Sequence, residues 1–194
     1  MTPNILRKLA FAMTASGVVV SAQAEPVNYA IDPLHTAVRF GYDHLGWTYQ
    51  QHGFDTLTGR VMLDRTARTA AVEVSIDARS VNTGSAIFNG QIQAEDLFDT
   101  ARYPAITFKS NSVKFEGDRL VSIAGDLTIK GITKPVTLSV TRFNAGPHPI
   151  QKKRESIGAD AVAKVKRSDF NLLKQLPMVA DDIDLSFTLQ AFKE

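Results

Sequence analysis

Apolar and polar residues alternate through residues 120–140, on both sides of a Gly-Ile-Thr-Lys-Pro turn. A period of two is typical of a β-strand that buries one face, because successive side chains point to opposite sides of the strand. The pattern therefore predicts a hairpin of two antiparallel strands. The apolar positions that share a face are Val121, Ile123, Leu127 and Ile129 before the turn, and Val136, Leu138 and Val140 after it.

The same period of two occurs in about eight segments in all. Besides the two strands of the hairpin, these are residues 37–42, 57–63, 72–76, 106–115, 158–165 and 183–191. In the segment 106–115 the apolar parity changes near Ser110 to Ser112, which indicates an inserted bulge residue. Several short strands with mostly short connections predict an all-β, antiparallel sandwich or barrel.

One segment departs from this pattern. Residues 88–101 mix apolar residues with acids and amides and end before Tyr103-Pro104, which favours one or two short helices between the third and fourth strands. We expect the apolar face of this segment to plug one end of the sheet structure. Its apolar residues are Phe88, Ile92, Leu97 and Phe98.

The first 24 residues have the features of a cleaved secretory signal peptide. Arg7 and Lys8 precede an apolar stretch that is too short for a comfortable membrane span, and Ala22-Gln23-Ala24 is suited to signal peptidase. We therefore expect cleavage after residue 24 and export. The remaining residues, 25–194, are long enough for one domain with a sizeable core and too short for two to be expected.

Composition narrows the classes of function. The chain has 22 Lys plus Arg, of which two lie in the leader, and 20 Asp plus Glu, so residues 25–194 carry no formal net charge. Without a basic patch we expect no nucleic-acid partner. The absence of cysteine excludes thiol chemistry and thiolate metal sites, and the four histidines lack the spacing of a zinc-protease helix. We predict no metal site and no required cofactor.

A set of short motifs in fixed order carries a resemblance that covers essentially all of residues 25–194. The motifs are Tyr29-Ala30-Ile31-Asp32-Pro33-Leu34-His35, His44-Leu45-Gly46, Gly53-Phe54, Ser80-Val81-Asn82-Thr83-Gly84, Phe98-Asp99, Tyr103-Pro104, Gly125-Asp126-Leu127-Thr128, Lys134-Pro135-Val136 and Arg167-Ser168-Asp169-Phe170. With them the chain resembles the YceI family of periplasmic polyisoprenoid-binding proteins. The resemblance implies an eight-stranded, antiparallel, lipocalin-like barrel in the periplasm, with a long isoprenoid lipid or quinone as its ligand and room for a homodimer.

The chain departs from the family pattern at one position. The family usually has Gly after Arg-Ser-Asp-Phe, whereas Asn171 follows here. Asn tolerates a left-handed backbone better than most residues, so we expect the same turn to be kept.

The resemblance and the strand parity together place the lipid in the barrel interior. Eight strands enclose a space that is either just filled by side chains or open to one small ligand, so occupancy stays open. Three alanines on one face of a strand predict a thin wall, whose alternative is an ordinary close-packed core. The residues expected to line the interior are Val38, Phe40, Tyr42, Val72, Val74, Ile76, Ile106, Phe108, Val121, Ile123, Leu127, Ile129, Val136, Leu138, Val140, Ala159, Ala161, Ala163, Leu185, Phe187 and Leu189.

Five further residues are candidates for the mouth and for head-group contacts: His44, Trp47, Arg167, Asp169 and Phe170. His44 suits either a loop-anchoring hydrogen bond or a ligand contact. Arg167 and Asp169 suit either a structural cluster at a turn or a head-group site. Trp47 suits either a lid on the core or contact with a lipid head or a membrane surface.

The sequence thus favours a periplasmic carrier of a long-chain isoprenoid lipid, either a polyprenyl lipid or an isoprenoid quinone, that performs no catalysis. No Gly-x-Ser-x-Gly elbow or paired acid and base is visible. Two alternatives remain at this point. One is an enzyme that acts on such a lipid through His44 or through Arg167 and Asp169, and the other is a stress-related interaction protein with a filled barrel.

Overall fold

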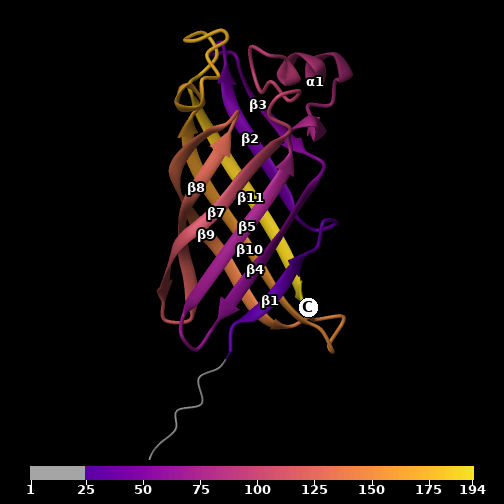
Figure 1. Cartoon of the computed structure of the whole chain (residues 1–194), viewed down its shortest axis with the longest axis vertical. Coiled ribbons are helices and arrows are strands. Elements are labelled where there is room, and N and C mark those ends of the chain that lie inside the picture. The colour runs from indigo at the N-terminus through magenta and orange to yellow at the C-terminus, as the bar shows by residue number, and fades with distance from the viewer. Residues whose placement is uncertain (1–24) are drawn as a thin grey trace, which may run out of the picture.

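The computed structural model of the protein describes residues 25–194, and the expected signal peptide, residues 1–24, lies outside the described residues. The described chain forms a β-barrel with a short helix at one end (Figure 1). Its strands are β1 (Val27–Ile31), β2 (Ala37–His44), β3 (Thr48–Phe54), β4 (Leu57–Asp64), β5 (Thr69–Asp77), β6 (Val81–Asn82), β7 (Ala105–Glu116), β8 (Arg119–Ile129), β9 (Ile132–Pro147), β10 (Glu155–Lys166) and β11 (Asp182–Lys193). Its helices are α1 (Ala86–Gln93) and the 3₁₀ helices η1 (Ala78–Ser80) and η2 (Arg167–Phe170).

Eight strands close the barrel, as predicted. The hydrogen-bonded order is β1-β4-β5-β7-β8-β9-β10-β11, and β11 pairs back with β1. Every strand pair is antiparallel. At the upper end of Figure 1, β2 replaces β1 beside β11, and β3 and β6 continue the wall from β2. Residues 32–36 interrupt the wall between β1 and β2, where Asp32 accepts a hydrogen bond from the backbone N–H of Leu34 at 3.0 Å.

Three of these strands were not among the predicted segments, namely β1, β3 and β6. The sequence of β3 is Thr-Tyr-Gln-Gln-His-Gly-Phe, which has no apolar alternation. All seven residues of β3 pair with β2, and this pairing forms a strand that the local pattern does not indicate. β3 therefore forms because it pairs with β2, and its own sequence pattern does not indicate it.

The predicted hairpin is present as β8 and β9, with a tighter turn than expected. Ile129 pairs directly with Ile132, so the turn consists of Lys130 and Gly131, with φ of 50° and 74°. Positive φ at both central residues is the requirement of a type I′ turn, whose twist matches that of paired strands. Pro135, the last residue of the turn that the sequence suggested, pairs with Asp126 inside β9.

Both bulges in the β7–β8 pairing affect the interior. The first lies between Ser110 and Ser112, as the parity change predicted. The second, at Lys114 and Phe115, shifts the register so that Phe115 pairs with Leu120. As a result Leu120 is buried in the core, and Val121, which was expected to face inward, lies at the irregularity and is only half-buried. The extra residue of this second bulge is Val121 itself, which has no pairing partner on β7.

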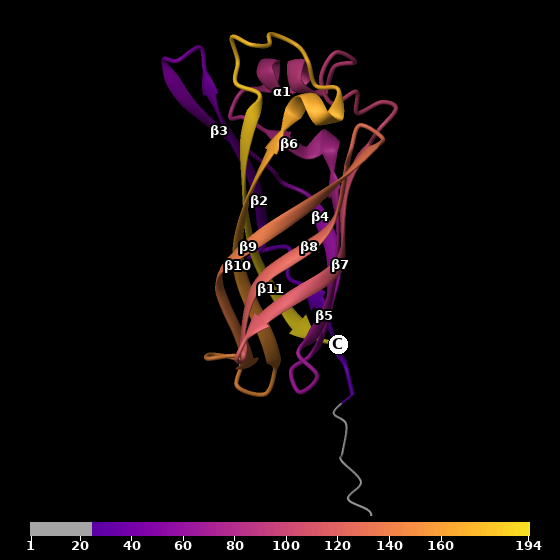
Figure 2. The ribbon, with the colours of Figure 1, turned by 90° about the vertical axis from the view of Figure 1, so that its left-hand side faces the viewer.

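The short helix covers the upper end of the barrel, where Figure 2 places it beside the loop between η2 and β11. The Ser85 side chain caps α1 by accepting from the backbone N–H of Phe88 at 3.4 Å. The predicted helical segment ran to residue 101, whereas α1 ends at Gln93 and turns follow. No helix within residues 25–194 combines the length and apolar character needed to span a membrane.

Candidate functional site

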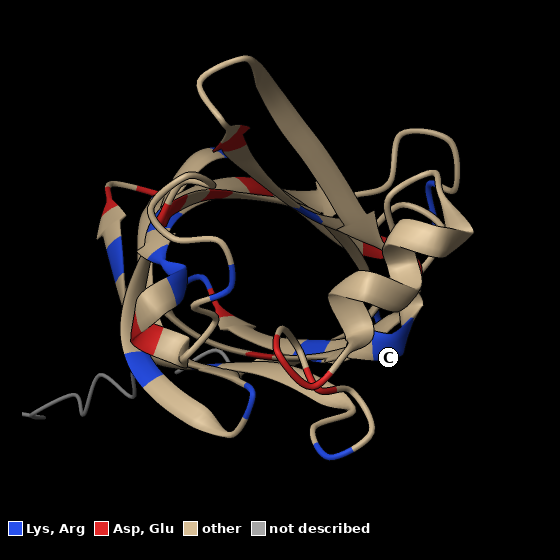
Figure 3. Ribbon diagram, turned by 90° about the horizontal axis from the view of Figure 1, so that it is seen from above, with Lys and Arg blue, Asp and Glu red and all other residues tan. Residues whose placement is uncertain are grey.

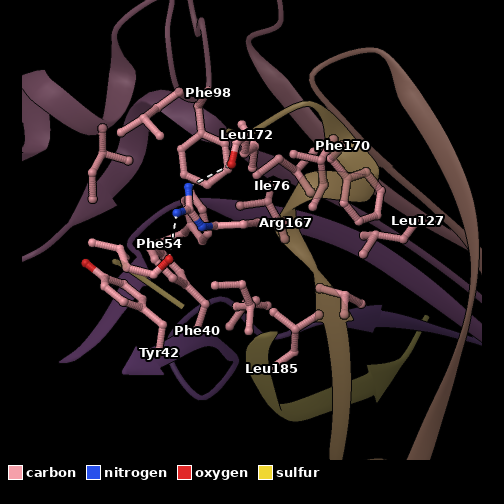
Figure 4. A pocket seen from close by; sticks show the side chains of 18 of the residues that line it. Phe40, Tyr42, Phe54, Ile76, Phe98, Leu127, Arg167, Phe170, Leu172 and Leu185 are labelled. Carbon is pink, nitrogen blue, oxygen red and sulfur yellow. Dashed lines mark hydrogen bonds between the residues drawn. The ribbon is translucent and has the colours of Figure 1, made fainter. Parts of the chain in front are cut away.

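An apolar cavity of about 170 Å³ lies in the upper half of the barrel, beneath α1 and the residues that follow η2. Figure 4 shows its aromatic and aliphatic side chains converging from several strands. Its lining residues are Val38, Phe40, Tyr42, His44, Phe54, Ile76, Phe88, Ile92, Leu97, Phe98, Ile106, Leu127, Ile129, Val165, Arg167, Phe170, Leu172, Lys174, Gln175, Val179, Ile183, Leu185 and Phe187.

Twelve of the predicted site residues line this cavity. Nine are interior residues and three are mouth residues, and they come from β2, β5, β7, β8, β11 and η2: Val38, Phe40, Tyr42, Ile76, Ile106, Leu127, Ile129, Leu185 and Phe187, with His44, Arg167 and Phe170. The apolar residues of the helical segment, Phe88, Ile92, Leu97 and Phe98, line it as well, so this segment covers the barrel end as expected.

The other predicted interior residues lie outside this cavity. Most belong to the hydrophobic core of the barrel: Val72, Val74, Phe108, Ile123, Val136, Leu138, Val140, Ala161, Ala163 and Leu189. Ala159 is half-buried and pairs with Phe143 and Leu189 across the sheet. The alanine face of β10 is thus opposite large side chains, since Ala161 pairs with Phe187 and is 6% exposed.

Two glycines on the barrel strands, Gly59 of β4 and Gly125 of β8, are also approached closely by neighbouring atoms. A Cβ atom on Gly125 would lie 2.7 Å from the Phe108 ring, and one on Gly59 would lie 2.7 Å from Ile31 Cδ1. Even so, the inward-facing side chains of Ala163, Leu185 and Leu189 stay only half-buried. A close-packed interior would bury them fully, so the packing along the inner face of β10 and β11 is incomplete.

Arg167 holds the upper loop in place through its guanidinium. Nε donates to Ala180 O at 2.9 Å, Nη1 to Leu172 O at 2.7 Å and Lys174 O at 2.8 Å, and Nη2 to Val179 O at 2.9 Å. Four of the five guanidinium N–H groups are therefore engaged, which leaves one for a ligand. Burial lowers the pKa of Arg167 from its ordinary value, although arginine stays charged.

The structure tests two predictions for the segment after Arg167, one about Asp169 and one about Asn171. Asp169 is exposed, while the acid that binds this segment is Asp181, which accepts from the Ser168 N–H and hydroxyl at 2.8 Å each. Arg167 thus has the structural role considered for it through backbone carbonyls, while the carboxylate that accepts hydrogen bonds in this turn is that of Asp181. Asn171 adopts φ 56° and ψ 35°, so it keeps the left-handed turn as expected.

His44 and Trp47 lie at the end of β2 and in the turn beyond it. His44 pairs with Val179 in an isolated β-bridge and lines the cavity. Trp47 is 89% exposed, so it forms no lid on the core. In residues 25–194 no group of three or more His, Asp or Glu side chains is arranged to hold a metal ion.

A polar pair that the sequence did not indicate borders the cavity. The Tyr42 hydroxyl lies 3.3 Å from Nε2 of His52, which is 7% exposed and packs against the rings of Phe40 and Phe88. Within the described residues, Nδ1 of His52 has no hydrogen-bond partner. His52 lies on β3, whose lack of alternation hid its inward position.

Burial lowers the pKa of His52, and a pH dependence of stability follows. Above its unfolded-state pKa of about 6.5 the residue is neutral whether folded or not. As the pH falls through that value, the unfolded chain binds a proton that the folded chain does not, so the free energy of unfolding falls, by at most ~1.4 kcal/mol per pH unit. Below the folded-state pKa the loss becomes constant.

Replacing His52 with Phe should remove this loss. We expect urea-unfolding curves measured between pH 7.5 and 4.5 to show a stability difference, wild type minus His52→Phe, that becomes more negative as the pH falls below about 6.5. A difference that is independent of pH would show that His52 is protonated equally easily in both states.

A family profile and individual protein sequences both match this chain to YceI proteins. The profile of the YceI-like domain matches residues 29–191. Protein YceI of Escherichia coli O157:H7 is 34% identical over 193 residues, which cover 97% of this chain and all of that protein. Protein YceI of Salmonella arizonae is 32% identical, with 93% and 94% covered.

Solved structures show the same fold. Burkholderia cenocepacia BcnA matches with a TM-score of 0.69 and 25% identity, covering 82% of this chain and 98% of that one. The Campylobacter jejuni YCEI protein gives 0.67 and 25%, covering 78% and 90%. A polyisoprenoid binding domain from Saccharophagus degradans gives 0.63 at 20% identity, covering 87% and 99%, and this likeness concerns the fold.

Proposed function

The chain belongs to the YceI-like domain family, and from that premise we propose that it binds a long-chain isoprenoid lipid, with the tail in the upper barrel, and carries it without chemical change. The observation that carries the proposal is the apolar cavity between α1, η2 and the strands. An isoprenoid tail has no hydrogen-bonding groups, and each CH₂ that leaves water for an apolar site contributes ~0.8 kcal/mol.

The size of the cavity indicates how the tail enters. An engineered apolar cavity of ~150 Å³ holds benzene, so the space of about 170 Å³ accommodates about one isoprene unit. The rest of a long tail follows the half-buried inner faces of β10 and β11, where side chains such as Leu185 and Leu189 rotate to lengthen the space. The lipid thus fills a barrel that is partly open before it binds.

The polar groups at the cavity favour a neutral head group that bears oxygen. The Tyr42 hydroxyl, which interacts with His52, and the remaining N–H of Arg167 can each bind a carbonyl or hydroxyl oxygen. Lys174, which lines the cavity, pairs with Asp96 at 2.5 Å. An isoprenoid quinone or a polyprenyl alcohol therefore suits the site better than a phosphorylated lipid. A saturated lipid with a charged head is expected to bind more weakly.

To test the proposal, the protein is purified from its native cells. It is then extracted with organic solvent, and the extract is analysed by mass spectrometry. We expect a stoichiometric, chemically unaltered isoprenoid lipid, and recovery in the periplasmic fraction in accord with the expected leader. A protein without bound lipid that also fails to take up an isoprenoid quinone from detergent would refute the proposal. Conversion of the added quinone, lost in His44→Ala, would instead favour the enzyme.

A further inference from the structure

Five large apolar side chains stand exposed around the cavity end of the barrel, and we call them the apolar rim. They come from the β2–β3 turn, the start of α1 and the loop between η2 and β11, three segments that Figure 2 places at the same end. Half of the ten exposed large apolar side chains of residues 25–194 are in this set. The rim consists of Leu45, Trp47, Ile87, Leu173 and Met178.

Hydrogen bonds and an ion pair join the three segments into one surface. The Leu45 N–H donates to Met178 O at 3.2 Å, which ties the β2–β3 turn to the loop before β11. Lys174 from that loop pairs with Asp96, which follows α1. Ile87 and Lys174 also line a single shallow depression. The rim is therefore a connected surface around the cavity end, whereas an exposed apolar residue that stands alone needs no explanation.

The charges around the rim are balanced. Lys174 pairs with Asp96 at 2.5 Å, and Arg102 pairs with Glu95 at 3.1 Å. Seen from above in Figure 3, acidic and basic residues are interspersed along the ribbon. A surface of this kind is attracted to a partner through its apolar side chains, with little dependence on the partner's charge. The indole of Trp47 suits a membrane interface, where its ring is buried and its N–H reaches polar groups.

We propose that the apolar rim docks on the surface of a lipid bilayer and holds the cavity end of the barrel against it. This inference rests on the proposed function, because a tail that passed through water would lose ~0.8 kcal/mol for each exposed CH₂. A mouth pressed into the bilayer interface lets the tail move from one apolar medium to another. A second copy of the chain seated on the rim would close this route, which is why the rim fits a bilayer better.

The test uses Trp47, the sole tryptophan of the chain, as its own reporter. Phosphatidylcholine vesicles added to the purified protein should shift its fluorescence to shorter wavelength and sediment the protein with them, and raising the salt from 50 to 500 mM should change little. The double variant Leu45→Ser, Met178→Ser should bind vesicles at least tenfold more weakly. The matched control is Leu34→Ser, Ile150→Ser, which alters two exposed residues away from the rim and should bind as the wild type does.

The outcomes separate this inference from the proposed function. Failure to bind vesicles, with quinone uptake from detergent intact, would overturn docking and leave the carrier function. Vesicle binding by a protein that takes up no lipid in its barrel would support docking and overturn the carrier function. Equal binding of the rim variant and the wild type would overturn docking by this surface. A fluorescence shift that depends on protein concentration without vesicles, with dimers in sedimentation velocity, would assign the rim to a second copy instead.

Discussion

Replacing Arg167 with alanine should lower the free energy of unfolding by about 3 kcal/mol or more, measured by urea unfolding. The guanidinium donates to the carbonyls of Leu172, Lys174, Val179 and Ala180, and so holds the residues after η2 against the barrel. A hydrogen bond to a charged group contributes ~1.5–3 kcal/mol, and four are lost together, although the contributions are not additive. Hydrogen exchange at the Val179 amide, which donates to Gln175 O at 2.9 Å, should accelerate.

Two variants control for this effect. Arg167→Lys keeps the positive charge but replaces the planar guanidinium, with its five N–H donors, by a compact ammonium group. Its free energy of unfolding should therefore lie between those of the wild type and Arg167→Ala. Arg60→Ala removes an exposed arginine that is paired with Glu73 and should change the urea midpoint little. If Arg167→Ala lowered the free energy of unfolding no more than Arg60→Ala does, the four hydrogen bonds would not be what holds the loop in place.

Replacing Leu185 with tryptophan should weaken the uptake of an isoprenoid quinone at least tenfold. Leu185 lines the cavity from β11, between Phe40 of β2 and Ala163 of β10 in the sheet register. An indole at this position takes the volume that the tail would occupy. A tenfold loss corresponds to ~1.4 kcal/mol, which is reached once the indole excludes two CH₂ groups at ~0.8 kcal/mol each. Uptake is measured by titration of the protein with quinone in detergent.

The matched control is Ser186→Trp, one residue along the same strand. Ser186 is exposed on the outer face, so the same side chain added there should leave uptake unchanged. Circular dichroism of both variants checks that the barrel is intact, and Leu185→Phe offers a smaller filler if the tryptophan variant does not fold. Undiminished uptake by a folded Leu185 variant would place the lipid elsewhere.

The alternation of apolar and polar residues predicted most of the interior, because in a closed barrel every second residue of a strand faces inward. Ile123, Leu127 and Ile129 are buried as their alternation indicated, and so are Val136 and Leu138. In a barrel every strand has one inner face, and a shift of one residue would expose all of it. Val165 and Ile183 share the parity of the predicted lining residues on their strands and could have been included on the same argument.

The rest depended on contacts that a single sequence does not display. Val121 is displaced by a bulge that concerns the pairing of two strands, and His52 lies on a strand without apolar alternation. The acceptors of Arg167 are backbone carbonyls, which every residue possesses, so no side-chain pattern could identify them. Leu172 and Val179 line the cavity from a loop, where periodicity has no meaning.

The seam between the first and last barrel strands determines when folding can finish. β1 reaches β11 through three residue pairs, Tyr29 with Lys193, Ala30 with Phe192 and Ile31 with Ala191. During synthesis the sheet stays open, with unpaired strand edges, until β11 has emerged, and contacts of such long sequence separation form slowly. A folding chain therefore passes through an interval in which its apolar inner face is exposed to any other chain nearby.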